Sequence, residues 1–124
     1  MKKVAVFENE YQLINTIFDT ANYYFFNNAF QFDYFPSSQS LHPFDLIENY
    51  PIVIVDIDLS QRSEMDGYAL LTKLNALENK PKIFILTGHS KVEKSLKERN
   101  LPSYPIINKP LAIKDLQDAL TPLV

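Results

Sequence analysis

The sequence predicts an α/β protein in which a central parallel sheet is covered by helices on both faces. Two observations support this fold class. Short β-rich apolar runs alternate with stretches of helical spacing. The clearest runs are apolar almost throughout, as is typical of strands that are buried on both faces. The 124 residues, of which 46 % are hydrophobic and 22 % charged, suit one compact domain over residues 1–124.

Five strands are expected in chain order. Three are strongly apolar, and they cover Val4–Phe7, Ile52–Ile57 and Lys82–Leu86. A further strand is expected at Phe30–Tyr34, where aromatic and polar residues alternate, and the last is expected at Pro105–Ile107. The chain therefore reads as five β/α units.

The helices are expected between the strands, where apolar residues recur on one helix face. They cover about Tyr11–Tyr24, a short helical stretch at Leu41–Ile47, a stretch after Gly67, a stretch from near Ser90, and Ala112–Leu120. The helix near Ser90 begins with Ser90 and Glu93 at the spacing of a capping box. Few of its residues are apolar, so we expect it to be mostly solvated.

Composition excludes several classes of protein. No segment has the roughly 18 consecutive apolar residues of a membrane span. With a net charge of -3, the protein lacks the excess of positive surface charge that non-specific nucleic-acid binding requires. The sequence has no cysteine, and the apolar stretch that follows Met1 is too short for a secretory signal. We therefore expect a cytoplasmic protein with no membrane partner and no direct nucleic-acid partner.

Polar residues follow four of the predicted strands. In an open parallel sheet, ligands bind at the carboxyl ends of the strands, so these residues are the candidates for chemistry. They are Glu8, Asn9 and Glu10 after the first strand, Asp56 and Asp58 after the third, Thr87, Gly88 and His89 after the fourth, and Asn108, Lys109 and Pro110 after the fifth. Acids, a hydroxyl and an ammonium should therefore meet at one edge of the sheet.

This set of side chains suits phosphoryl transfer. Several carboxylates without histidine or cysteine ligands favour a hard cation such as Mg²⁺, which often bridges to a phosphate oxygen. A carboxylate beside such a cation can attack phosphorus, while a hydroxyl and a lysine neutralise the oxygens of the transferring group. The sequence therefore predicts phosphoryl transfer to an aspartate.

The same motifs resemble those of a response-regulator receiver domain over essentially the full chain. An acidic cluster follows the first strand, and it is followed in order by IVDIDL, MDG, ILTG and NKPL at suitable spacing. The resemblance implies a flavodoxin-like, doubly wound sheet with strand order 2-1-3-4-5 and about five helices. It also implies a single signalling domain, similar to the stand-alone chemotaxis regulators, without an output domain.

The resemblance assigns roles by position. Asp56 corresponds to the phosphoacceptor, Thr87 to the hydroxyl that closes on the phosphoryl group, and Lys109 to the lysine that pairs with it. The bond between Lys109 and Pro110 is expected to be cis. Asp58 and His89 occupy the two positions at which receivers tune hydrolysis of the acyl phosphate.

The resemblance also implies a Mg²⁺ site. Its ligands would be Glu8, Asn9, Asp56 and the backbone carbonyl of Asp58. Asn9 stands where the family usually has an acid, and an amide oxygen lacks the charge of a carboxylate, so Mg²⁺ binding should be weak.

Two further departures from the family pattern concern the surroundings of the site. The loop between Asp56 and Met65 is longer than usual by about two residues over Ser60–Glu64, which predicts a remodelled loop. Ile106 replaces the aromatic residue that normally moves together with the threonine.

Three functional hypotheses follow. The first is a non-enzymatic response regulator that receives a phosphoryl group from a histidine kinase or phosphotransfer protein and signals to a downstream protein target. The second is a pseudo-receiver that binds partners without phosphorylation, which Asn9 and Ile106 favour. The third is a small haloacid-dehalogenase-like phosphatase, suggested by the DxD pattern of Asp56 and Asp58. The eight aromatic residues within Tyr23–Phe35 are too many to point inward together, which suggests the further hypothesis that some of them form a partner surface.

Overall fold

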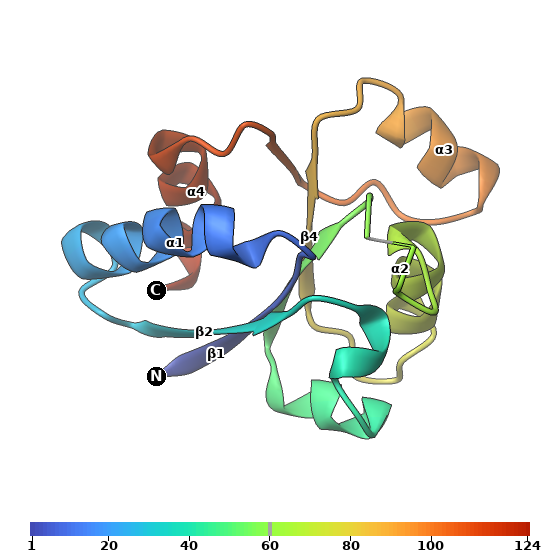
Figure 1. Cartoon of the computed structure of the whole chain (residues 1–124), viewed down its shortest axis with the longest axis horizontal. Helices are drawn as coiled ribbons and strands as arrows, with labels where there is room; N and C mark the ends of the chain where they lie inside the picture. The colour runs from blue at the N-terminus through green and yellow to red at the C-terminus, as the bar shows by residue number, and fades with distance from the viewer. Residues whose placement is uncertain (60) are drawn as a thin grey trace.

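The computed structural model describes residues 1–59 and 61–124. Its centre is a five-stranded parallel sheet in the order β2-β1-β3-β4-β5 (Figure 1). The strands are β1 (Lys2–Phe7), β2 (Phe30–Phe35), β3 (Ile52–Asp56), β4 (Lys82–Thr87) and β5 (Ile106–Asn108). The predicted fold class, the five strands and their order are therefore confirmed.

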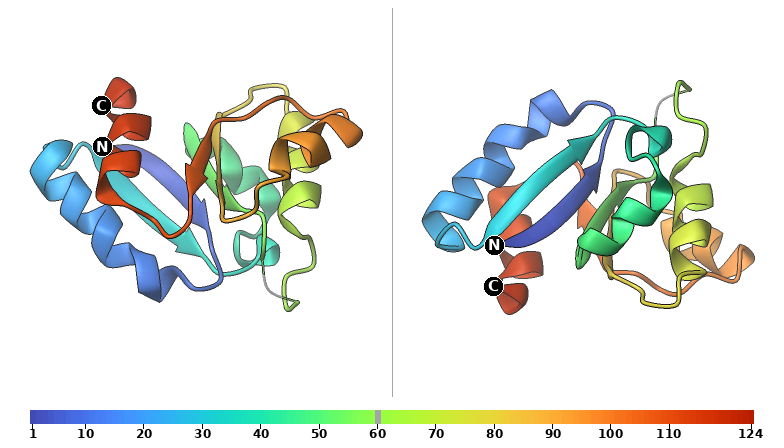
Figure 2. Two further views of the ribbon diagram at one scale, coloured as in Figure 1. Left: turned by 90° about the horizontal axis from the view of Figure 1, so that it is seen from above. Right: turned by 90° about the horizontal axis from the view of Figure 1, so that it is seen from below.

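Helices cover both faces of the sheet (Figure 2). The α-helices are α1 (Tyr11–Phe25), α2 (Gly67–Asn75), α3 (Val92–Glu98) and α4 (Ile113–Leu120). Three short 3₁₀-helices complete the described part of the chain: η1 (Ser38–Ser40), η2 (Phe44–Asn49) and η3 (Thr121–Leu123). The helical stretch expected at Leu41–Ile47 is thus a 3₁₀-helix, η2, which starts after Pro43. Among the described residues, none of these helices has the length and apolar character needed to cross a bilayer.

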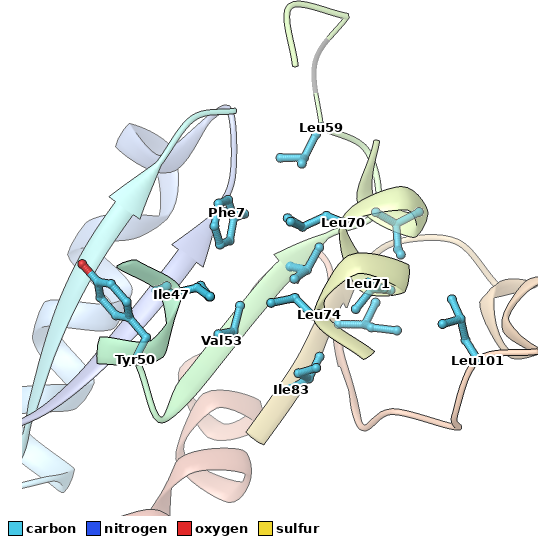
Figure 3. Packing of buried hydrophobic residues seen from close by; sticks show 14 of the residues in the cluster. Phe7, Ile47, Tyr50, Val53, Leu59, Leu70, Leu71, Leu74, Ile83 and Leu101 are labelled. Carbon is cyan, nitrogen blue, oxygen red and sulfur yellow. The ribbon is translucent and has the colours of Figure 1, made fainter. Parts of the chain in front are cut away.

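The sheet separates two hydrophobic cores because side chains alternate between the faces of a strand. Val4 and Val6 of β1 pack with α1 and α4, and Phe18 of α1 is fully buried against this face. Ala5 and Phe7 point to the other face, where they meet α2, α3 and η2. Figure 3 shows this second core, in which leucines of α2 lie over β3 and β4.

The start of α3 differs from the sequence prediction. The helix begins at Val92 after Lys91, and no side chain caps its first turn. Ser90 lies one residue too early to serve as the cap, so the expected capping box with Glu93 does not form. The prediction that this helix is mostly solvated is confirmed, since the buried residues of α3 are Val92 and Leu96.

The aromatic segment divides between core and surface. Phe26 and Phe30 are buried against α1 and the sheet, whereas the side chains at the end of α1 remain exposed. The exposed aromatic residues of this segment are Tyr23, Tyr24 and Phe25. The prediction that not all eight aromatic residues point inward is therefore confirmed.

Candidate functional site

The carboxyl ends of the strands bring four predicted site residues together. Glu8 follows β1, Asp56 ends β3, Thr87 ends β4, and Lys109 follows β5. Glu8, Asp56 and Thr87 are each about 1 % exposed. Acidic residues are almost never buried this deeply unless a charged partner lies close to them. The chain thus places two carboxylates, a hydroxyl and an ammonium at one edge of the sheet.

Lys109 supplies the positive charge for both buried acids. Its Nζ atom lies 3.0 Å from Oε2 of Glu8 and 3.0 Å from Oδ2 of Asp56. Burial alone would lower the pKa of Lys109, but its close contacts with the Glu8 and Asp56 carboxylates and their negative charges outweigh burial and raise the pKa. Lys109 is therefore held as a cation between the two carboxylates. The Lys109-Pro110 bond is cis, as the sequence predicts.

Glu8 has an unusually high pKa of about 7. Burial is the largest cause, and the interaction with the neighbouring Asp56 raises the pKa further, while Lys109 opposes both. The Oε1 atom accepts a hydrogen bond from the N–H of Glu10 at 3.1 Å. The Oε2 atom takes no hydrogen bond of good geometry, although the Lys109 ammonium lies close to it. The Oε2 atom of Glu8 therefore has the Lys109 ammonium as its charged partner and keeps lone pairs that a second cation would use.

The raised pKa of Glu8 predicts a pH dependence of stability. The unfolded chain releases the Glu8 proton near 4.5, while the folded chain holds it until about 7. In this interval the folded state binds more protons, so the free energy of unfolding falls as pH rises. We expect urea denaturation to show a fall of roughly 2 kcal/mol between about pH 5 and 8. Glu8→Gln should lack this fall, and an equal fall in that variant would contradict the assignment.

Asp56 and Thr87 are each fixed by a residue two positions further along the chain. The N–H of Asp58 donates to Oδ1 of Asp56 at 2.9 Å, and the N–H of His89 donates to Oγ1 of Thr87 at 3.0 Å. The side chains of Asp58 and His89 then meet, with Oδ2 and Nε2 separated by 2.6 Å. Both of these side chains are more than half exposed. The two predicted tuning positions therefore form a bridge between the loops after β3 and β4.

Asn9 lies apart from this hydrogen-bond network. It is half-buried and lines a groove of about 450 Å³. The other lining residues are Pro36, Ser37, Gln39 and Arg62. Within residues 1–59 and 61–124, no three histidine, cysteine or acidic side chains gather at one point as a metal cluster would. A cation at this edge would have Glu8 and Asp56 as its two carboxylates, with uncharged oxygens for the rest.

Gly67 and a group of polar residues in two loops also shape the site, and sequence reasoning gave neither of them a role. A Cβ atom on Gly67 would lie 2.5 Å from the carbonyl oxygen of Asp56 and 2.5 Å from Cα of Ile57. Side-chain bonds also join the loop after β3 to η1, across 25 residues of sequence. The MDG motif was the available signal for Gly67, whereas contacts between two loops leave no local pattern.

The family model of the response regulator receiver domain matches residues 37–121. No curated protein matches the chain. Among solved structures, the receiver domain of Francisella response regulator 1452 is 20 % identical, with a TM-score of 0.73 and coverage of 99 % of this chain and 96 % of that one.

Two further structures are similar. The receiver domain of NtrX from Brucella abortus is 19 % identical, with a TM-score of 0.72 and coverage of 97 % of this chain and 95 % of that one. A CheY-like receiver domain protein from Methanospirillum hungatei JF-1 is 21 % identical, with a TM-score of 0.70 and coverage of 99 % and 93 %. These likenesses support the fold. Since the family model matches more than half of the sequence, this chain belongs to the response regulator receiver domain family.

Proposed function

We propose that this chain accepts a phosphoryl group on Asp56 in a two-component pathway and signals by contact with another protein. The observation that carries this proposal is the setting of Asp56. Its buried carboxylate lies 3.0 Å from the Lys109 ammonium through Oδ2, and the N–H of Asp58 holds Oδ1 at 2.9 Å. A carboxylate that is fixed and paired with a cation suits nucleophilic attack on phosphorus.

The proposed donor is the phosphohistidine of a histidine kinase or phosphotransfer protein. A carboxylate oxygen of Asp56 forms the new bond to phosphorus while the bond from phosphorus to the histidine nitrogen breaks, and the imidazole leaves with the electron pair. In this proposal Lys109 and the Thr87 hydroxyl neutralise the oxygens of the transferring group, and the 3.0 Å distance from the Lys109 ammonium to Asp56 supports the role of the lysine. This is a single group transfer to the protein itself, so we propose a signalling acceptor and not an enzyme.

Mg²⁺ is the proposed cofactor. Glu8 and Asp56 would supply carboxylate oxygens, and the amide of Asn9 and the backbone carbonyl of Asp58 would supply uncharged oxygens. The fit rests on the buried Oε2 atom of Glu8, which has no hydrogen bond of good geometry. When bound, the cation would offset the negative charge that the phosphoryl group brings beside two acids.

Asn9→Asp is expected to tighten Mg²⁺ binding. The substitution replaces a neutral amide oxygen by a charged one at nearly constant size, so the dissociation constant should fall about tenfold. Titration followed by ¹H-¹⁵N NMR measures this change without a phosphodonor. Gln12→Glu, which adds the same charge at an exposed position of α1, is the matched control and should leave the affinity close to wild type. Equal affinities in wild type and Asn9→Asp would remove Asn9 from the ligand set.

We place the contact with the protein donor on α1 beside the site. An apolar pocket of about 270 Å³ lies between α1 and the loop after β5. Its lining residues are Glu8, Glu10, Leu13, Ile14, Ile17, Lys109, Pro110 and Leu111. Leu13 is 72 % exposed, an unusual position for a large apolar side chain, and it lies at the rim of the pocket that contains Lys109.

Leu13→Asp should slow phosphoryl transfer from a protein donor. We expect a loss of about tenfold or more in the rate with a phosphorylated histidine phosphotransfer protein, because a buried interface carboxylate without a partner is costly. Labelling by the small donor phosphoramidate should not change. Leu46→Asp, at an exposed leucine on η2, is the control for loss of a surface leucine. If Leu13→Asp slows both donors equally, the effect lies in the site and not in docking.

A pseudo-receiver that never uses phosphorylation is the alternative. Asn9 and Ile106 favour it, because both depart from the family pattern. Glu8, Asp56 and Lys109 argue against it, since a pure binding module gains nothing from two buried acids around one ammonium. The phosphatase hypothesis is weaker, because Asp58 pairs with His89 and is therefore poorly placed to act as a free general acid.

A further inference from the structure

The loop after β3 is tied to the turn that follows β2. We call the three side chains that make this connection, Ser38, Gln39 and Ser63, the loop clamp. The clamp joins segments that lie about 25 residues apart in sequence. Ser63 lies within Ser60–Glu64, where the sequence predicts a remodelled loop. Ser60 itself lies outside the described residues.

Ser38 and Ser63 form the inner half of the clamp. Ser38 is 2 % exposed, and its N–H donates to Oγ of Ser63 at 2.8 Å. The Ser38 hydroxyl accepts a hydrogen bond from the N–H of Met65 at 3.0 Å. The Ser63 hydroxyl donates to the carbonyl of Met65 at 2.6 Å, with the Ser38 hydroxyl 3.1 Å away. Two serines therefore satisfy both backbone groups of Met65.

Gln39 forms the outer half. Its Nε2 atom donates to the carbonyl of Arg62 at 2.7 Å, and its Oε1 atom accepts from the N–H of Glu64 at 2.9 Å. The side chain thus holds the loop backbone at two points, as a neighbouring strand would. Gln39 itself is exposed, so its replacement should cost little folding energy.

The clamped loop begins and ends at the phosphoacceptor. At its start, the N–H of Asp58 holds the Asp56 carboxylate. At its end, the N–H of Gly67 bonds to the carbonyl of Ile57 at 3.3 Å. On the opposite side, Gln39 shares the wall of the 450 Å³ groove with Asn9. The clamp is therefore linked to both proposed uncharged ligands, to the Asp58 carbonyl through the loop backbone and to Asn9 through the groove that Gln39 also lines.

We propose that Ser38, Gln39 and Ser63 are positioning residues for the cation site. They hold the loop after β3 so that the Asp58 carbonyl and Asn9 keep a geometry that a hard cation can use. Outer residues that orient ligands have large effects on metal affinity. The effect should be greatest where the ligands carry little charge, as with Asn9 in place of an acid. The proposal rests on the proposed function and adds a role for three side chains that are not among the proposed ligands.

The test compares Gln39→Ala and Ser63→Ala with Ser40→Ala as the matched control. Ser40 belongs to the same turn, and its hydroxyl bonds to Ser37, but it is not among the residues that line the groove with Asn9. Mg²⁺ affinity is measured by ¹H-¹⁵N NMR titration of the full chain, and thermal unfolding of each variant is recorded beside it. We expect the dissociation constant to rise roughly tenfold in the two clamp variants and to stay unchanged in Ser40→Ala.

A drop in melting temperature with wild-type Mg²⁺ affinity in both clamp variants would overturn the proposal, because the clamp would then be structural only. Failure of the proposed function gives a different result. In that case, wild type takes up no phosphoryl group from phosphoramidate, whatever the affinities of the variants. Gln39→Ala keeps the test valid if Ser63→Ala does not fold, since Gln39 is exposed.

Discussion

Asp56→Asn should abolish formation of the acyl phosphate. The amide keeps the size of the side chain and an oxygen that accepts the bond from the N–H of Asp58, but it removes the charged oxygen that attacks phosphorus. Intact mass after incubation with acetyl phosphate or phosphoramidate and Mg²⁺ measures the result directly. We expect the mass of one phosphoryl group on wild type and none on the variant.

His89→Ala is the matched control for this experiment. It breaks the 2.6 Å contact with Asp58 but leaves the acceptor intact, so the variant should still be labelled, with a changed half-life of the acyl phosphate. Labelling of Asp56→Asn at the wild-type level would show that the acceptor is another residue. Absence of labelling in wild type and variant alike would favour the pseudo-receiver.

The sequence was sufficient to predict the sheet and the edge of the sheet at which the candidate site residues lie. The apolar runs Val4–Phe7 and Ile52–Val55 have no polar position that could face water, so a parallel sheet covered on both faces was the consistent solution. In such a sheet the carboxyl ends of the strands meet at one edge. Glu8, Asp56 and Lys109 had to come close together for that reason, whatever the details of the loops.

The features that escaped prediction depend on contacts between distant loops. The connection between β2 and β3 has three prolines and few apolar residues at helical spacing, and tertiary packing resolves it as the 3₁₀-helices η1 and η2. The bonds between Ser38 and Ser63, and between Asp58 and His89, join residues whose proximity follows only from the fold. The capping box predicted at Ser90 was wrong, because its spacing to Glu93 fits a cap whereas the backbone enters α3 after Lys91.

Gly67→Ala should destabilise the fold more than an ordinary surface substitution. Gly67 is the first residue of α2, which starts there because the Asp66 carboxylate accepts a bond from the N–H of Ala69. An added methyl group would lie 2.5 Å from the Asp56 carbonyl oxygen and 2.5 Å from Cα of Ile57, and these backbone atoms cannot move without disturbing Asp56, the proposed phosphoacceptor. Overpacking of this kind costs about 1–3 kcal/mol, and the better helix propensity of alanine returns less than about 1 kcal/mol.

The expected net loss is therefore about 1–2 kcal/mol in the free energy of unfolding, measured by urea denaturation. Gly88→Ala is the control, because its added methyl group would meet the nearest side-chain atom, Cβ of Lys109, at 3.7 Å, an ordinary contact distance. If the two variants are equally stable, the helix start has room to shift, and the close approach of α2 to Asp56 is not a constraint on the site. If only Gly67→Ala is destabilised and its labelling by phosphoramidate also slows, the glycine is required because α2 packs directly on the backbone of the phosphoacceptor.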